Sequence, residues 1–173
     1  MKKSLFFIIV LCSTPLLSLA QSKEKGFFVE GSIAYSDTHY KHSVFLTPTV
    51  GYQFHTRWSA GMKASFETGD LAWQVYTPFI RYAFLQHNNL SLFTEAQWNI
   101  WRRNVDGGQS GFSEVGLNFG ATYAVSQHFR IIGHYLFLGY SGQDKEGAWL
   151  GQNTDFGLDA NVQRFQLGVQ YIF

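Results

Sequence analysis

Hydrophobic and polar residues alternate over the last ten positions of the chain, 164–173. Side chains at alternate positions of a β-strand point to opposite faces, so this pattern predicts a strand with one apolar and one polar face. The apolar positions are Phe165, Leu167, Val169, Tyr171 and Phe173, and the polar ones are Arg164, Gln166, Gly168 and Gln170.

The ending of this strand occurs four times in the chain. Each copy has the pattern apolar-x-Tyr-x-apolar, where x is any residue. Each copy also ends an alternating run. The copies lie at 50–54, 80–84, 121–125 and 169–173. Such regular spacing predicts a meander of hairpins. We predict eight strands, over residues 27–36, 43–54, 58–67, 73–84, 90–101, 112–125, 129–140 and 156–173.

The connections between these strands differ at the two ends. Those that follow the first three tyrosine copies are short and polar, at 55–57, 85–89 and 126–128. Those at the other end carry Asp, Gly, Ser, Lys and Asn, at 37–42, 68–72, 102–111 and 141–155. Short turns on one side and longer loops on the other are typical of transmembrane barrels with an even number of strands. The sequence therefore predicts an all-β fold: a closed, eight-stranded, antiparallel up-and-down transmembrane β-barrel with a polar, side-chain-filled interior.

The two faces of the predicted strands differ in chemistry. The face that carries the tyrosines is rich in aromatic residues, and we expect it to point outward. Its members are Val29, Ile33, Tyr35, Leu46, Val50, Tyr52, Trp58, Met62, Phe66, Ile80, Tyr82, Leu92, Trp98, Leu117, Phe119, Tyr123, Phe129, Ile131, Tyr135 and Phe137. Six aromatic residues on this parity cluster beside the short turns, where a girdle at the membrane interface is expected: Tyr52, Trp58, Tyr82, Tyr123, Phe129 and Tyr171.

The opposite parity carries charge of both signs. Four acids and four bases share it, and we expect them to form an interior polar network in which Arg81 pairs with Glu95. The eight residues are Glu30, Lys63, Glu67, Arg81, Glu95, Glu114, Arg130 and Arg164.

Residues 1–20 have the features of a secretory signal peptide. Lys2 and Lys3 precede an apolar stretch, and Ser18 and Ala20 supply the small residues that signal peptidase requires. We therefore expect cleavage after Ala20 and one barrel domain over 21–173. A membrane anchor is the alternative, but its helix would need roughly 20 apolar residues, and this stretch is short and interrupted. Cys12 is the only cysteine, so the mature chain is expected to contain no disulfide and no cysteine ligand.

Composition supports a strand protein whose outer surface does not face water. Aromatic residues make up 18% of the chain and charged residues only 14%, well below the roughly 25% of an average soluble domain. The formal net charge of +1 gives no support to nucleic-acid binding. If the chain crosses a membrane without a long apolar helix, it must do so as a closed β-barrel.

The chain resembles the small eight-stranded outer-membrane β-barrels of the outer-membrane-protein A/X type, and the outer-membrane β-barrel or porin-like families of Bacteroidetes. The resemblance lies in P-x-x-G-Y-x-F at 48–54, R-Y-x-F at 81–84 and the terminal Y-x-F. Gln166, Gly168, Tyr171 and Phe173 match the C-terminal signal that the barrel-assembly machinery recognises. The resemblance implies a monomer in the cell outer membrane, with lipid and that machinery as partners.

Three functions are compatible with these observations. The first is a structural or surface-interaction role without an open pore, since eight strands enclose only enough space for side chains. Trp149 and Leu150 in the longest loop would then offer a surface contact. The second is a lipid A-modifying enzyme using His134 and an inward carboxylate, and the third is a soluble, lipocalin-like ligand binder with the tyrosine face inward. We expect no cofactor and no metal, because His39 and His42 have only Asp37 as a nearby carboxylate.

Overall fold

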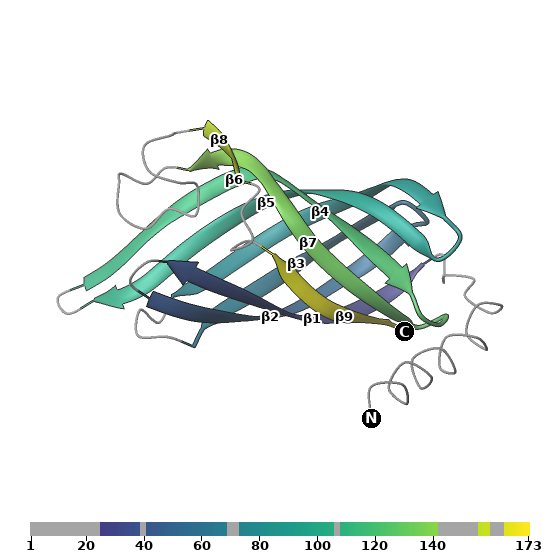
Figure 1. Cartoon of the computed structure of the whole chain (residues 1–173), viewed down its shortest axis with the longest axis horizontal. Coiled ribbons are helices and arrows are strands. Elements are labelled where there is room, and N and C mark those ends of the chain that lie inside the picture. The colour runs from purple at the N-terminus through teal and green to yellow at the C-terminus, as the bar shows by residue number, and fades with distance from the viewer. Residues whose placement is uncertain (1–24, 39–40, 69–72, 106–107, 142–155, 160–164) are drawn as a thin grey trace, which may run out of the picture.

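Nine antiparallel strands make up the described part of the protein. In a computed structural model, residues 25–38, 41–68, 73–105, 108–141, 156–159 and 165–173 are described. Each strand from β1 to β7 pairs with the next along the chain, as in a meander (Figure 1). The strands are β1 (Gly26–Thr38), β2 (Lys41–His55), β3 (Trp58–Glu67), β4 (Gln74–His87), β5 (Leu90–Val105), β6 (Gly108–Ala124), β7 (Phe129–Ser141), β8 (Phe156–Asp159) and β9 (Gln166–Ile172).

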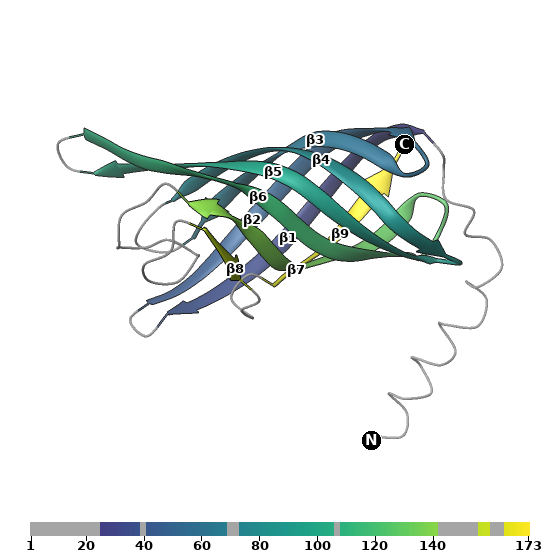
Figure 2. The ribbon, with the colours of Figure 1, turned by 90° about the horizontal axis from the view of Figure 1, so that it is seen from above.

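The last two strands complete the wall. β9 pairs with β1 on one side and with the turn end of β7 on the other, while β8 pairs with the loop end of β7. β8 and β9 therefore share the eighth position, and the sheet closes on itself. Seen from two directions, the strands tilt steeply around one axis, as closure requires (Figures 1 and 2). The predicted closed eight-stranded antiparallel barrel is confirmed.

Two predicted connections are shorter than expected. β1 runs to Thr38 and β2 starts at Lys41, and β5 runs to Val105 with β6 starting at Gly108. The strands thus extend through most of the stretches predicted as loops, because backbone pairing continues past the last clearly alternating residue. The predicted eighth strand, 156–173, is described as two segments, and residues 160–164 between them lie outside the described part of the chain.

The turns at the opposite end are tight, as predicted. His55 pairs with Trp58 and His87 with Leu90, so the β2–β3 and β4–β5 hairpins have two-residue loops, and four residues, 125–128, join β6 to β7. Asn88 adopts a φ of 51°, the left-handed conformation that such hairpin turns favour and that asparagine tolerates well.

The apolar parity points outward. Val50 is 60% exposed and Trp98 50% exposed, while Thr49 and Gln97 beside them are buried. An apolar exterior around a polar interior reverses the arrangement of a water-soluble barrel and suits a lipid environment. The lipocalin-like alternative is therefore wrong, because it required the tyrosine face to line the interior.

One residue predicted to point outward faces the interior instead. Phe137 is fully buried, because the register between β6 and β7 shifts by one residue between Phe119 and Gly120. Phe119 pairs with Leu136 and Gly120 with His134, which leaves Tyr135 as an extra residue in β7. A β-bulge of this kind exchanges the two faces for every residue beyond it.

Aromatic rings fill the interior beside several inward glycines of the wall. A Cβ added to Gly51 would lie 2.3 Å from the ring of Phe28, and one added to Gly120 would lie 2.5 Å from the ring of Phe93. These rings use the space that the missing side chains leave. Phe79 stands over Gly61 in the same way, and Phe137 over Gly116 and Gly139.

Two Thr-Pro steps interrupt the hydrogen-bond ladder in the middle of the wall. Within the described strands, the β2–β3 ladder has no pair at Thr47 or Pro48, and the β4–β5 ladder has none at Thr77 or Pro78. Proline has no backbone N–H to donate. In both places the inward threonine hydroxyl donates instead across the gap, from Thr47 Oγ1 to the Ser65 hydroxyl at 2.8 Å and from Thr77 Oγ1 to the Asn99 amide oxygen at 2.9 Å.

Candidate functional site: a charged cluster across the barrel interior

A cluster of two acids, two bases and a histidine occupies the middle of the barrel. The Arg81 guanidinium donates to Glu95 Oε1 at 2.6 Å and to Glu30 Oε2 at 3.1 Å, so the expected Arg81–Glu95 pair is present. Lys63 Nζ donates to the second oxygen of Glu95. All four side chains are buried, and they come from β1, β3, β4 and β5.

His134 of β7 lies between the two carboxylates of this cluster. Its Nε2 is 3.5 Å from Glu30 Oε1, and its Nδ1 is 3.7 Å from Glu95 Oε2. These separations are long for hydrogen bonds, and they become ion pairs only when the imidazole is protonated. The structure therefore places His134 beside Glu30 and Glu95, which identifies the inward carboxylates that the sequence left unspecified.

Aromatic rings enclose the Arg81 guanidinium. Its Cζ lies 4.6 Å from the ring centre of Phe93, 5.3 Å from that of Phe79 and 5.8 Å from that of Phe28. Cations are attracted to the faces of aromatic rings within about 6 Å, and more strongly where water is excluded. We name Glu30, Lys63, Arg81, Glu95 and His134, with these three rings, the central cluster.

The remaining charged residues of the predicted network lie elsewhere. Glu114 is buried and accepts from Asn99 Nδ2 at 3.2 Å and Trp101 Nε1 at 3.1 Å. Glu67 accepts from the backbone N–H of Trp73 near the loop end. Arg130 donates to Gln53 Oε1 at 3.3 Å near the turn end. Arg164 lies outside the described residues, as do Trp149 and Leu150 of the predicted surface contact.

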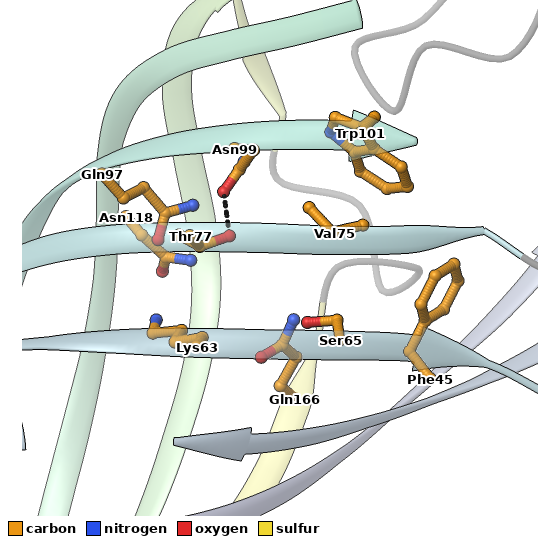
Figure 3. Close-up of a pocket in the computed structure, with 10 residues that line it drawn as sticks. All are labelled: Phe45, Lys63, Ser65, Val75, Thr77, Gln97, Asn99, Trp101, Asn118 and Gln166. Atoms are coloured by element: carbon orange, nitrogen blue, oxygen red, sulfur yellow. Dashed lines mark hydrogen bonds between the residues drawn. The ribbon is translucent and has the colours of Figure 1, made fainter. Parts of the chain in front are cut away.

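Two small cavities flank the central cluster. The one toward the loops has a volume of about 40 Å³ and is lined by polar groups, with Trp101 and Phe45 toward the loop end (Figure 3). The one toward the turns has a volume of about 30 Å³. By this measure they hold roughly three and two water molecules. Lys63 borders the first and Arg81 the second, so the ion pairs of the central cluster lie between them.

Solved structures with this architecture are known. No protein-family model matches the chain, and no curated protein matches it. The N-terminal β-barrel domain of Pseudomonas aeruginosa OprF superposes with a TM-score of 0.60 at 14% sequence identity. Neisserial surface protein A superposes with a TM-score of 0.56 at 15% identity. Each match covers 88% of this chain and 100% of the solved chain. The fold is that of a small outer-membrane β-barrel.

The exterior of the barrel carries paired aromatic residues near the short turns. The ring centres of Trp58 and Tyr82 are 4.6 Å apart, and those of Phe129 and Tyr171 are 4.9 Å apart. Such a girdle marks the membrane interface in outer-membrane barrels. Within the described ranges, no helix is long and apolar enough to span a membrane.

The predicted assembly signal lies at the closure of the barrel. Gln166, Gly168 and Tyr171 belong to β9, and Phe173 follows it. The backbone N–H of Phe173 bonds to the carbonyl oxygen of Phe27, and its ring packs against Tyr171 at 5.0 Å. Recognition of these residues by an assembly machinery stays a prediction.

Sequence reasoning missed the aromatic part of the central cluster. Each ring lies two residues before a charged member: Phe28 before Glu30, Phe79 before Arg81 and Phe93 before Glu95. Residues two apart in a strand share a face, so the aromatic-x-charged spacing was a usable signal. Among the described residues, no group of three or more His, Cys, Asp or Glu is placed to hold a metal ion.

Proposed function

We propose that the protein is an integral outer-membrane β-barrel with a structural or surface-interaction role and no open pore. The observation that carries this proposal is the central cluster, which fills the interior of a barrel with an apolar exterior. The likeness to solved outer-membrane barrels supports the location. The buried ion pairs, with Glu95 at 0% exposure, support a closed interior.

Reconstitution into lipid vesicles tests the closed interior. Vesicles that contain the folded protein should swell in isotonic solutions of small sugars no faster than protein-free vesicles. A swelling rate that rises with protein content and falls with sugar size would overturn the proposal of a closed barrel. Folding is checked on the same sample by gel electrophoresis, where a detergent-stable barrel migrates differently before and after boiling.

Lipid A modification is the alternative that the sequence left open, and the position of His134 argues against it. A catalytic base must reach the proton that it abstracts. His134 is 1% exposed and stands inside the wall between two carboxylates, whereas a lipid would approach from outside. Overexpression should therefore leave the mass profile of lipid A unchanged. A new lipid A species that disappears in a His134→Gln variant would support the enzyme instead.

The partners of the barrel follow from the same proposal. Membrane lipid would contact the outward apolar residues, and an assembly machinery would bind the terminal strand. Trp149 and Leu150 are the proposed surface contact. A double substitution of these two residues by Ser should leave the boiling-dependent gel shift unchanged while weakening attachment of whole cells to a surface, and unchanged attachment would count against them.

A further inference from the structure

The cavity at the turn end has an excess of positive charge. Three arginines line it, namely Arg57 in the β2–β3 turn, Arg81 and Arg130. Among the described residues, no aspartate or glutamate lines the same space. The two arginines of the wall come from strands that are not neighbours, Arg81 from β4 and Arg130 from β7.

The central cluster does not neutralise this excess. Its two carboxylates, Glu30 and Glu95, are matched by the charges of Arg81 and Lys63. No charge of these two carboxylates remains to balance that of Arg130. Its hydrogen bond goes to the neutral oxygen of Gln53, and within the described part of the chain no carboxylate lies at ion-pair distance from it. A half-buried guanidinium beside another cation is costly unless a counter-ion compensates it.

The cavity has the size and the donors for such a counter-ion. A volume of about 30 Å³ exceeds the roughly 10–15 Å³ that one water molecule needs, so a single monoatomic anion can enter the cavity. The hydroxyl groups of Ser59 and Thr122, both buried, line it together with the Arg130 guanidinium and can all donate hydrogen bonds. Arg57 is exposed at the rim, where its charge would attract an anion from solution.

We propose that this cavity is a binding site for a halide ion, with chloride as its natural occupant, held chiefly by Arg130. The ion balances the charge of Arg130 and fixes the turn end of the interior to the central cluster. The site lies away from the loops and is independent of any surface partner.

Thermal unfolding of the full barrel in detergent tests the proposal. The boiling-dependent gel shift gives the midpoint, and sodium chloride or bromide is titrated against sodium gluconate at constant ionic strength. We expect a saturable rise of the midpoint in chloride and in bromide. Arg130→Gln should abolish the rise, and Arg103→Gln, which removes the same charge beside Trp73 at the loop end, should keep it. An equal rise in both variants would mean a general salt effect and would overturn the site, as would no rise in the parent protein.

Two further measurements keep the test decisive if Arg130→Gln does not fold. Arg57 is an exposed turn residue, so Arg57→Gln should fold and should raise the chloride concentration for half the effect roughly two- to fivefold. Crystals grown in bromide should show an anomalous peak in the cavity beside Arg130. A cavity without that peak would refute the proposal whatever the variants do.

Discussion

The central cluster predicts a large loss of stability when Glu95 is changed to Gln. The carboxylate accepts from Arg81 through one oxygen and from Lys63 through the other, and the side chain is fully buried. An amide of the same shape removes the charge and offers one oxygen in place of two. Among the described residues, Glu30 would then be the only acid at ion-pair distance from these two buried cations. Removing one partner from a buried ion pair costs about 3–5 kcal/mol, and we expect Glu95→Gln to fall in that range.

Urea-induced unfolding in lipid vesicles, followed by tryptophan fluorescence, measures this change in the free energy of unfolding. The slope with urea should stay the same, because the variant exposes the same surface on unfolding. The matched control is the double variant Lys63→Met with Glu95→Gln, which leaves Arg81 and Glu30 as a balanced pair. Because these residues touch, the double variant should recover about 1–3 kcal/mol relative to Glu95→Gln. The reasoning fails if Glu95→Gln costs less than about 1 kcal/mol, the range of an exposed pair, or if the second substitution destabilises further.

Two more predictions concern the packing of the interior. Gly120→Ala should cost about 1–3 kcal/mol, because its Cβ would lie 2.3 Å from a carbonyl oxygen of β7 and 2.5 Å from the Phe93 ring. Gly31→Ala is its control, since nothing lies within 4 Å of the added Cβ, and it should be neutral or stabilising by up to about 1 kcal/mol. Thr77→Val should cost about 1–2 kcal/mol, because the buried Asn99 amide oxygen loses its donor. The same urea experiment measures the stability of all three variants. Equal stability of the two alanine variants would contradict the packing argument. An unchanged stability of Thr77→Val would contradict the hydrogen-bond argument.

The wall of the barrel could be predicted from the sequence because nearly every strand alternates cleanly. Period-two alternation fixes which residues share a face, and short polar turns fix where the strands reverse. β7 is the exception. Residues 135–138 are four consecutive apolar residues, so the pattern there does not encode which side chains point inward. The extra residue at Tyr135 is set by pairing with β6, which the sequence of β7 alone does not contain.

The composition of the central cluster was harder to predict than the direction of its side chains. Parity places a side chain inside the barrel but not at a height along its axis. That height depends on the stagger between strands, which is fixed only when the barrel closes. Glu30 meets Arg81 across 51 positions of sequence, while Glu114 pairs in register with Asn99 and takes its hydrogen bonds from that residue and from Trp101. An equal count of acids and bases therefore indicated a balanced interior, but only the Arg81–Glu95 pair, on adjacent strands, could be named in advance.

The two Thr-Pro steps show why a polar interior also serves the wall of this barrel. In lipid, a backbone group that loses its partner cannot turn to water, so a proline in mid-strand is costly. In β2 and β4 the residue before the proline faces inward, and its hydroxyl bonds to the following strand. An apolar residue at the position of Thr47 or Thr77 could not make that link. At both repeats of Thr-Pro, a side-chain hydrogen bond on the inner face therefore links the two strands where the backbone ladder is broken.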